Sequence, residues 1–513
     1  MADQWTVRKR EVRSEKGLVA CQNVLAAEAG AAALSRGGNA MDAAVTAALA
    51  LSVVEPWLSG VGGGGFLLHA DGRTGAVDAL DFNVHSSRNL DPAHYPLAEG
   101  GEGNWFNWPP VKDDRNLIGY GSICVPGAVA GLSQALERFG TISFAEALQP
   151  AIEHARRGLV LDWFALLALA IDANGLSRFP ASAALFLKEG RAPRGSEPGI
   201  VRTLPMPRKA AMLERLASAG ARDFYEGEVA ASLIADLNAG GSPIDAAELR
   251  DYAPRWREPL RACYRGWSVH AIPGLSGGPT LVAALGELDR TLSDGDPLGG
   301  HTALAFARAI RRATEHRLRT LGHAGGGSCT THLSVVDRDG TMVSLTNTLL
   351  SRFGSKVVLP GTDLLMNNGM MWFDPRPGQP NSIAPGVRPL ANMCPVIATE
   401  AGLPRLALGA AGGRQIMPAV AQILSYAAGF GLSLEEAMNA PRIDASGVTL
   451  RVNRKARPDV ATRLAEEFPV EIVDDTLYPV NFSIPSAVAR DGAENIGMAH
   501  PNHPHAAVCR EGA

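Results

Sequence analysis

The chain has 513 residues, a formal net charge of −4 and 46% hydrophobic residues. These values exclude a disordered chain and predict a large folded protein, with either several domains or one layered domain. The charge leaves no basic excess for nucleic acid, and no apolar signal segment follows Met1, so we expect a cytoplasmic protein without a nucleic-acid partner. The apolar stretch from Ala43 to Val54 is too short for a bilayer, so we expect no membrane partner.

The first third of the chain predicts two packed helices followed by a strand. Small and aliphatic residues recur at helical spacing from Leu25 to Val54, with a break at Gly37-Gly38. Four glycines, Gly62 to Gly65, then lead into a strand-like segment from Phe66 to Ala70. Because no Lys-Ser/Thr pair follows them, we interpret these glycines as close backbone packing or a pocket wall rather than a phosphate loop.

The middle of the chain predicts helices and then a flexible segment. Amphipathic patterns predict helices within residues 127–157 and 209–251 and from His301 to Thr320. Residues 184–206 are rich in Pro, Gly and Arg, which is typical of a surface connection. The glycine-rich run from Leu321 to Cys329 fits neither helix nor strand, and such a run can be cut or displaced.

The last third predicts strands that are covered by helices. Thr331 to Asp337 and Met342 to Thr348 form a predicted hairpin around the turn Asp339-Gly340. A Pro-rich loop, a short strand at Leu406 to Leu408 and a helix opened by Gly412-Gly413 follow. Two strands near residues 483–489 and 496–499 close the chain, so the pattern predicts a layered α/β architecture.

The predicted hairpin places two threonines together. With its turn at Asp339-Gly340, antiparallel pairing brings Thr348 within about one residue of Thr330. A threonine hydroxyl needs an adjacent base to be a nucleophile, and a free α-amine on the same residue has a pKa near 8. That amine requires cleavage between Cys329 and Thr330; without it, both threonines are ordinary strand residues.

A set of motifs in chain order makes the sequence resemble the gamma-glutamyltransferase superfamily of N-terminal-nucleophile hydrolases. The run Thr330-Thr-His-Leu-Ser-Val-Val-Asp-x-Asp-Gly resembles the start of that family's small subunit. Further matches extend over nearly the whole chain: Gly62-Gly-Gly-Gly-Phe66, Asp81-Phe82, Val125-Pro-Gly-Ala-Val-Ala-Gly131, Phe353-Gly-Ser-Lys, Asn367-Asn368, Arg388-Pro-Leu, Met393-x-Pro395, Gly409-Ala-Ala-Gly-Gly413 and Ala440-Pro-Arg442.

The resemblance implies a four-layer αββα sandwich made as a proenzyme. It implies self-cleavage into a large subunit, residues 1–329, and a small subunit, residues 330–513, which together form one domain and can pair as a dimer of the processed heterodimer. Thr330 is then the nucleophile, Thr348 its hydrogen-bond partner, and Gly412 and Gly413 supply oxyanion-hole N–H groups. His332 reads as a satisfied core histidine or an orienting residue. No metal or organic cofactor is implied.

The sequence departs from the family at positions that grip a γ-glutamyl group. The family's carboxylate-binding arginine is Asn83, its serine pair is Ala391-Asn392, and its amine-binding aspartate is Trp372. Gly369 and Leu350 replace two further polar residues. A zwitterion without charged partners would lose several kcal/mol of binding free energy, so we expect a smaller, more aromatic pocket.

This pattern leads to one favoured substrate and two alternatives. It resembles the branch that holds oxamate amidohydrolases of purine breakdown, so oxamate is the first expectation. The alternatives are a gamma-glutamyltransferase or glutathione hydrolase, and a class IV cephalosporin acylase. Asn83, Trp372, Asn392 and Arg414, which follows the oxyanion glycines, are the candidate substrate-binding residues. A proenzyme that keeps the fold without catalysis is a further alternative.

Overall fold

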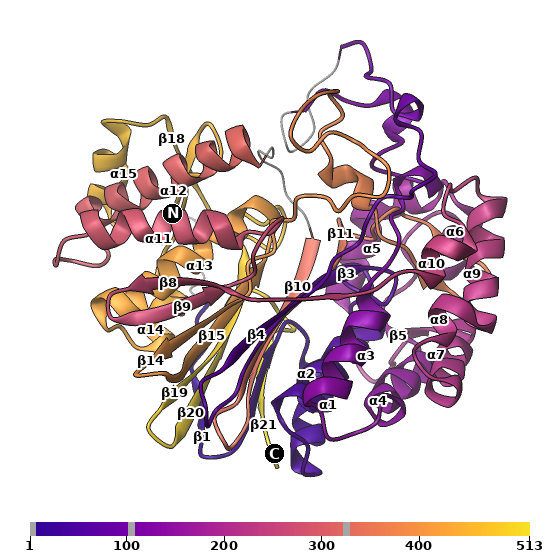
Figure 1. The fold of residues 1–513 in the computed structure, drawn as a ribbon, viewed down its shortest axis with the longest axis horizontal. Coiled ribbons are helices and arrows are strands. Elements are labelled where there is room, and N and C mark those ends of the chain that lie inside the picture. Colours follow the sequence, from indigo (N-terminus) through magenta and orange to yellow (C-terminus); the bar gives the residue numbers. More distant parts are fainter. Residues whose placement is uncertain (1–6, 101–107, 322–328, 513) are drawn as a thin grey trace.

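The computed structural model describes residues 7–100, 108–321 and 329–512, except the side chains of residues 318, 329 and 330 (Figure 1). Two antiparallel sheets stand side by side in the middle of the molecule, and helices cover the outer face of each (Figure 1). The expected four-layer αββα sandwich is therefore confirmed. No helix in the described ranges combines the length and apolar character that a membrane span requires.

The first sheet contains the predicted hairpin at its centre. Its strands follow the order β21 (Ala507–Arg510), β2 (Leu18–Cys21), β10 (Cys329–Val336), β11 (Met342–Leu350), β3 (Gly64–Ala70), β4 (Val77–Phe82) and β7 (Arg255–Arg257). The turn between β10 and β11 has Gly340 at a φ of 83°, a backbone conformation that glycine adopts without strain. The Asp339-Gly340 hairpin is confirmed.

The second sheet joins segments from both ends and the middle of the chain. Its order is β1 (Val12–Ser14), β20 (Glu494–Ala499), β19 (Ile484–Asp491), β15 (Leu403–Ala411), β14 (Val396–Glu400), β9 (Trp267–Ala271) and β8 (Leu260–Tyr264). The sequence patterns predicted β15, β19 and β20 but not β8, β9 or β14. Smaller pairings outside the two sheets are β5 (Leu159–Val160), β6 (Thr203–Leu204), β12 (Val358–Leu359), β13 (Leu364–Leu365), β16 (Ile443–Asp444), β17 (Leu450–Asn453) and β18 (Val470–Val473).

Each sheet carries its own helical layer. The helices on the side of the first sheet are α1 (Val24–Ser35), α2 (Ala40–Val54), α3 (Ala128–Phe139), α4 (Phe144–Arg157), α5 (Trp163–Leu176), α6 (Pro180–Phe186), α7 (Pro207–Ala219), α8 (Asp223–Glu226), α9 (Glu228–Ala239) and α10 (Ala246–Arg250). Those on the side of the second are α11 (Gly278–Thr291), α12 (Gly300–Thr320), α13 (Ile416–Leu424), α14 (Leu434–Asn439) and α15 (Pro458–Ala465). Both predicted N-terminal helices and the break between them are confirmed.

Local sequence explains why α2 forms the buried centre of its layer. The side chain of Asn39 accepts hydrogen bonds from the first turn and Asp42 reaches back to the Asn39 N–H, a reciprocal cap. Every residue of α2 is buried, as its continuous alanine and aliphatic sequence predicts. In α1, a Cβ on Gly30 would lie 2.9 Å from the Ala43 carbonyl oxygen, so glycine permits the close approach of the two helices.

Three apolar clusters separate the four layers. Leu67 and Leu345 of the first sheet pack with α2 and its neighbouring helices, whereas Leu408 of the second sheet packs with α11 and α13. Between the sheets lies a third cluster, which includes Phe66 and Ala407. Alternate residues of each central strand therefore face either the helices or the other sheet.

Candidate active site

The register of the hairpin places the start of β10 beside Thr348. Cys329 pairs with Leu350 and Thr331 pairs with Asn347, with an irregularity between the two pairs. The backbone of Thr330 therefore lies opposite Thr348 and its neighbour. Thr348 is fully buried, and its hydroxyl oxygen accepts a hydrogen bond of 2.8 Å from the N–H of Leu350. The predicted proximity of the two threonines is confirmed for the backbone.

The same row of residues continues across the sheet to Asn83. Thr348 pairs with Gly64 of β3, and the adjacent pair joins Gly65 of β3 to Phe82 of β4. Asn83 follows Phe82 directly, so it lies at the level of Gly64 and Thr348. Directly paired residues share a face of the sheet. The end of the first sheet thus presents one row from the start of β10 to Asn83.

The glycines on either side of Gly64 allow the strands to approach closely. A Cβ on Gly63 would lie 2.0 Å from the Thr348 carbonyl oxygen, and one on Gly65 would lie 2.1 Å from that of Thr346. Any larger residue would push β3 away from β11. The interpretation of the glycine run as close backbone packing is therefore confirmed.

His332 lies on β10 between the two sheets. It is fully buried, and its two ring nitrogens lie 3.0 Å from the hydroxyl oxygens of Thr346 and Ser334. Burial lowers its pKa to about 3, so the ring is neutral at pH 7. The interpretation as a satisfied core histidine is confirmed, since both nitrogens have partners inside the sandwich.

The two sheets run so that the Gly412-Gly413 turn lies toward the start of β10. A Cβ on Gly409 of β15 would lie 2.4 Å from the His332 ring, which shows that these two residues are in contact. Ser344 pairs with Ser334, which lies two residues after His332 on β10. The hydroxyl of Ser344 donates to the carbonyl of Leu408, the residue before Gly409. Increasing number in β15 therefore corresponds to decreasing number in β10.

The backbone at this turn requires glycine. Gly412 has a φ of 131° and Gly413 has a φ of 64°, and a Cβ on Gly412 would lie 2.8 Å from the Cα of Ser483. A helical segment follows at once and continues as α13. Such a turn leaves N–H groups unpaired by the helix. Their use as oxyanion donors stays a prediction.

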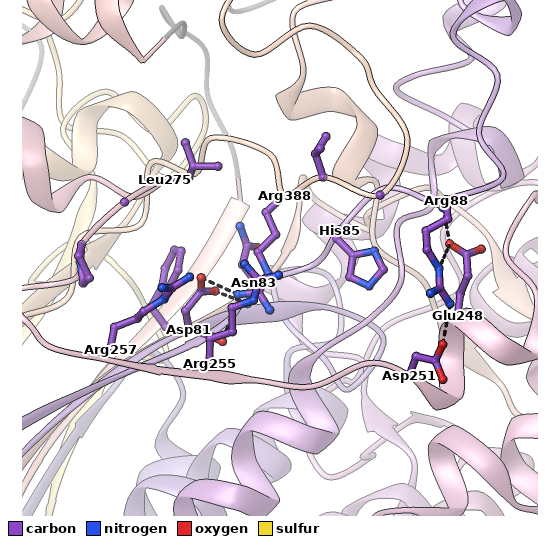
Figure 2. Close-up of a pocket in the computed structure, with 15 residues that line it drawn as sticks. Asp81, Asn83, His85, Arg88, Glu248, Asp251, Arg255, Arg257, Leu275 and Arg388 are labelled. Atoms are coloured by element: carbon purple, nitrogen blue, oxygen red, sulfur yellow. Dashed lines mark hydrogen bonds and ion pairs between the residues drawn. The ribbon is translucent and has the colours of Figure 1, made fainter.

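A cavity of about 630 Å³ opens at the same end of the first sheet (Figure 2). Phe66, Asp81 and Asn83 line it; all three lie on the face that looks toward the second sheet. The wall also contains Arg88 and Arg388. Most of the labelled lining residues are charged, so the expected aromatic character is wrong for this cavity.

Ion pairs fix most of the charges in the cavity wall. Arg388 lies 2.5 Å from the carboxylate of Asp81, and Arg88 lies 2.9 Å from that of Asp251 and 3.8 Å from that of Glu248 (Figure 2). Each of the three carboxylates of the wall therefore has an arginine partner. Burial lowers the pKa of His85, which also lines the cavity, so this ring adds no charge at pH 7.

The structure separates the four predicted substrate-binding residues. Asn83 lines the cavity, whereas Trp372 is fully buried in the apolar cluster between the sheets and does not line it. The short helical turn Gly369–Trp372 directs that side chain into the core. Asn392 and Arg414 are half-buried and also lie outside the cavity lining. Contacts of these residues with substrate stay predictions.

Arg414 and Arg317 differ in their partners. No described residue forms an ion pair or hydrogen bond with the Arg414 guanidinium. Arg317, which the sequence patterns missed, is buried and donates to the carbonyls of Ser276 and Ala391 at 2.6 and 2.7 Å. Arg317 also donates a longer hydrogen bond, of 3.4 Å, to the Asn392 side-chain oxygen.

Comparison with known proteins agrees with this geometry. A family model described as Gamma-glutamyltranspeptidase matches residues 26–325 and 319–509. The chain is 34% identical over 504 residues to the Acylase ACY 1 proenzyme of Pseudomonas sp. (strain SE83), covering 90% of this chain and 88% of that protein. It is 31% identical over 511 residues to the Glutathione hydrolase proenzyme of Escherichia coli (strain K12), covering 87% and 84%.

The fold agrees with a solved structure over nearly its full length. The crystal structure of cephalosporin acylase from Bacillus halodurans superimposes with a TM-score of 0.83 and 26% identity, covering 99% of this chain and 98% of that one. The family model and the full-length relatives lead to the same assignment. The chain belongs to the gamma-glutamyltranspeptidase family, whose members are hydrolases of carbon–nitrogen amide bonds.

Proposed function

We propose that this chain is an acylase that cuts itself between Cys329 and Thr330 and then uses Thr330 to hydrolyse an acyl amide. One observation carries the proposal: the row at the end of the first sheet runs from the start of β10, past Thr348, to Asn83 in the cavity wall. The proposed nucleophile and Asn83 lie in the same row, with β11 and β3 between their strands, and the cavity provides space for a substrate at the end of that row. Thr348 and the Gly412-Gly413 turn do not themselves line the cavity. That the curated relatives are named proenzymes supports the self-cleavage.

The proposed chemistry needs the α-amine of Thr330. In the uncut chain this nitrogen is bonded to the carbonyl carbon of Cys329, and cleavage releases it as an amine with an ordinary pKa near 8. The amine takes the hydroxyl proton as the oxygen of Thr330 attacks the substrate's carbonyl carbon. The proton then passes to the departing amine, which leaves an ester on Thr330, and water hydrolyses that ester to release the acid.

Two further groups complete the proposed site. N–H groups of Gly412 and Gly413 stabilise the oxyanion, a contribution of about 3 kcal/mol for each donor in comparable enzymes. Thr348, whose hydroxyl is fixed by the N–H of Leu350, orients the nucleophile. Because His332 is neutral and fully engaged with two hydroxyl groups, it takes no part in proton transfer in this proposal.

The substrate that fits best is an N-acyl amine larger than oxamate. A cavity of about 630 Å³ has the size of sites that enclose drug-sized ligands, whereas oxamate would fill a small part of it. The relatives reported above are named as acylases and as a glutathione hydrolase, which supports the acylase alternative over oxamate. We therefore place an acylase first.

A γ-glutamyl substrate is the second candidate, favoured by the 31% identity to the Escherichia coli glutathione hydrolase proenzyme. Its zwitterion requires charged partners. Two of the family's polar positions hold the fully buried, uncharged Leu350 and Ala391. Asn83 is committed to local contacts, since its side-chain oxygen accepts from the N–H of Val84 at 2.9 Å. These observations rank glutamyl transfer below acyl hydrolysis.

Mass spectrometry and three substrates test the proposal. We expect the purified protein to give two fragments that meet at Cys329/Thr330, and to hydrolyse glutaryl-p-nitroanilide faster than γ-glutamyl-p-nitroanilide. Ammonia release from oxamate should be slow. Faster turnover of the γ-glutamyl compound would support the second candidate instead.

Two variants of the nucleophile separate processing from folding. Thr330→Ser retains a hydroxyl and should still be cut, whereas Thr330→Ala should remain a single chain and be inactive. Cleavage of Thr330→Ala at the same bond would show that another group attacks, and would overturn the role of Thr330. Circular dichroism of both variants provides the control for folding.

A further inference from the structure

The edge strand β7 places two arginines in the far wall of the cavity. In the backbone register of the sheet, Arg255 lies opposite Asp81 of β4 and Arg257 lies opposite Ala79. Both arginine side chains therefore lie on the face that looks toward the second sheet. Trp256, between them, lies on the opposite face with its ring 5.5 Å from that of Phe139. Because Trp256 packs against the helices, its two neighbours point to the other face of β7, and both arginines line the cavity (Figure 2).

These two arginines are the cations of the cavity that no acid neutralises. The lining contains four arginines and three carboxylates. Arg88 and Arg388 already pair with those carboxylates. Within the described part of the chain, neither Arg255 nor Arg257 forms a side-chain ion pair or hydrogen bond, and both are exposed. Four arginines against three carboxylates give the lining one excess positive charge, and the arginines of β7 carry no ion pair, so an anionic group that enters the cavity is attracted to this wall.

The strand order gives the distance between this wall and the nucleophile. β10 and β7 are separated by four strand spacings, since β11, β3 and β4 lie between them. At about 4.8 Å for each spacing, the two backbones lie roughly 19 Å apart. An arginine that leans over β4 brings its guanidinium at most about 7 Å closer, to roughly 12 Å across the strands. Arg255 also lies level with His332, two residues along β10 from Thr330, which adds about 7 Å in that direction and makes the distance roughly 14 Å.

We propose that Arg255 and Arg257 form an anion subsite that binds a substrate carboxylate about 14 Å from the scissile amide. The inference rests on the proposed acylase function and defines its substrate class. Because an extended carbon chain advances only about 1.3 Å for each bond, a chain of about twelve carbons covers that distance, which is longer than a glutaryl group. The carboxylate can belong to the acyl chain or to the amine, because in either case the two guanidinium groups bind the same anionic group.

Substrate pairs that differ only in charge test the subsite. On the acyl side, dodecanedioyl mono-p-nitroanilide is compared with its methyl ester; on the amine side, the hexanoyl amide of 12-aminododecanoate is compared with its methyl ester. The double variant Arg255→Met/Arg257→Met should lower the ratio of kcat/KM for acid over ester about tenfold in one of the two pairs. The pair that responds identifies the end of the substrate that bears the carboxylate.

Arg261→Met is the matched control. This arginine is also exposed on a strand, but it lies on β8 of the second sheet, outside the cavity lining, and donates to the Ser268 hydroxyl at 3.0 Å. It should leave both ratios at the wild-type value. An unchanged ratio in both pairs for the double variant would overturn the subsite.

A binding measurement separates the subsite from the proposed activity. Calorimetric titration with dodecanedioate needs no turnover, and the double variant should bind it about tenfold more weakly than the wild type. Because salt screens exposed charges, raising the ionic strength should weaken dodecanedioate binding to the wild type more than to the variant. Equal affinities would overturn the subsite even where acylase activity is present. Weaker binding without acylase activity would leave the subsite and refute the proposed function.

Discussion

Glu55 provides a quantitative test of burial in this fold. It follows α2, is fully buried, and neither carboxyl oxygen forms a hydrogen bond with a described residue. Burial raises its pKa to about 8, and the attraction of His505 and the repulsion of Asp162 act in opposite directions on that value. The nearest cation-forming group is His503, whose Nε2 lies 3.5 Å from Oε1 of Glu55.

Both groups of this contact are neutral at pH 7. Burial also lowers the pKa of His503 to about 3, so the contact joins an uncharged carboxyl to an uncharged imidazole rather than forming an ion pair. The Glu55 carboxyl group has an ordinary pKa of 4.5 when the chain is unfolded and a pKa of about 8 in the folded chain. Between these pH values the folded chain holds a proton that the unfolded chain has lost, so stability falls as pH rises.

The Glu55→Gln variant removes this dependence. A pKa raised from 4.5 to about 8 lowers the free energy of unfolding by about 4 kcal/mol between pH 5 and pH 9. Glutamine does not titrate, so the variant should gain that amount relative to the wild type over this range. Since a chain of this size has an unfolding entropy of about 1 kcal/mol per degree, the melting temperature should shift by about 4 °C.

Differential scanning calorimetry at pH 5, 7 and 9 measures the effect. Histidines that do not interact with Glu55 titrate in both proteins, so their contribution cancels in the difference between wild type and variant. The interaction with His505 affects the Glu55 pKa less than burial does. Glu153→Gln, at an exposed side chain on α4, should show no such trend. A wild-type–variant difference that stays constant from pH 5 to pH 9 would refute the argument that burial keeps Glu55 protonated.

Three further substitutions test the sandwich and its row of site residues. Thr348→Val keeps the side-chain shape but removes the buried hydroxyl, so the rate of self-cleavage, measured by gel electrophoresis, should fall by about tenfold to a hundredfold. Gly409→Ala puts a Cβ 2.4 Å from the His332 ring, so thermal unfolding should show a loss of about 1 to 3 kcal/mol. Arg388→Met leaves the Asp81 carboxylate without its partner, and we expect urea unfolding to show a loss of about 3 kcal/mol.

Much of the fold follows from short-range features of the sequence. The alternation of β10 and β11 around Asp339-Gly340 sets a register that brings Thr348 to the start of β10, because the side-chain period of a strand is two. Helical spacing with capping residues predicts α1 and α2. The short strands β8, β9 and β14 were missed because their residues are stabilised as strands by neighbours in the sheet rather than by their own pattern.

The candidate site divides in the same way. Sequence by itself determined the family and the hairpin that places two threonines together. Only the tertiary structure decided that Trp372 lies in the core and that Asn83 shares a cavity with Arg255 and Arg257. Motif and period are properties of neighbouring residues, whereas a cavity forms where segments distant in the chain meet, and that depends on how the two sheets and their edge strands pack.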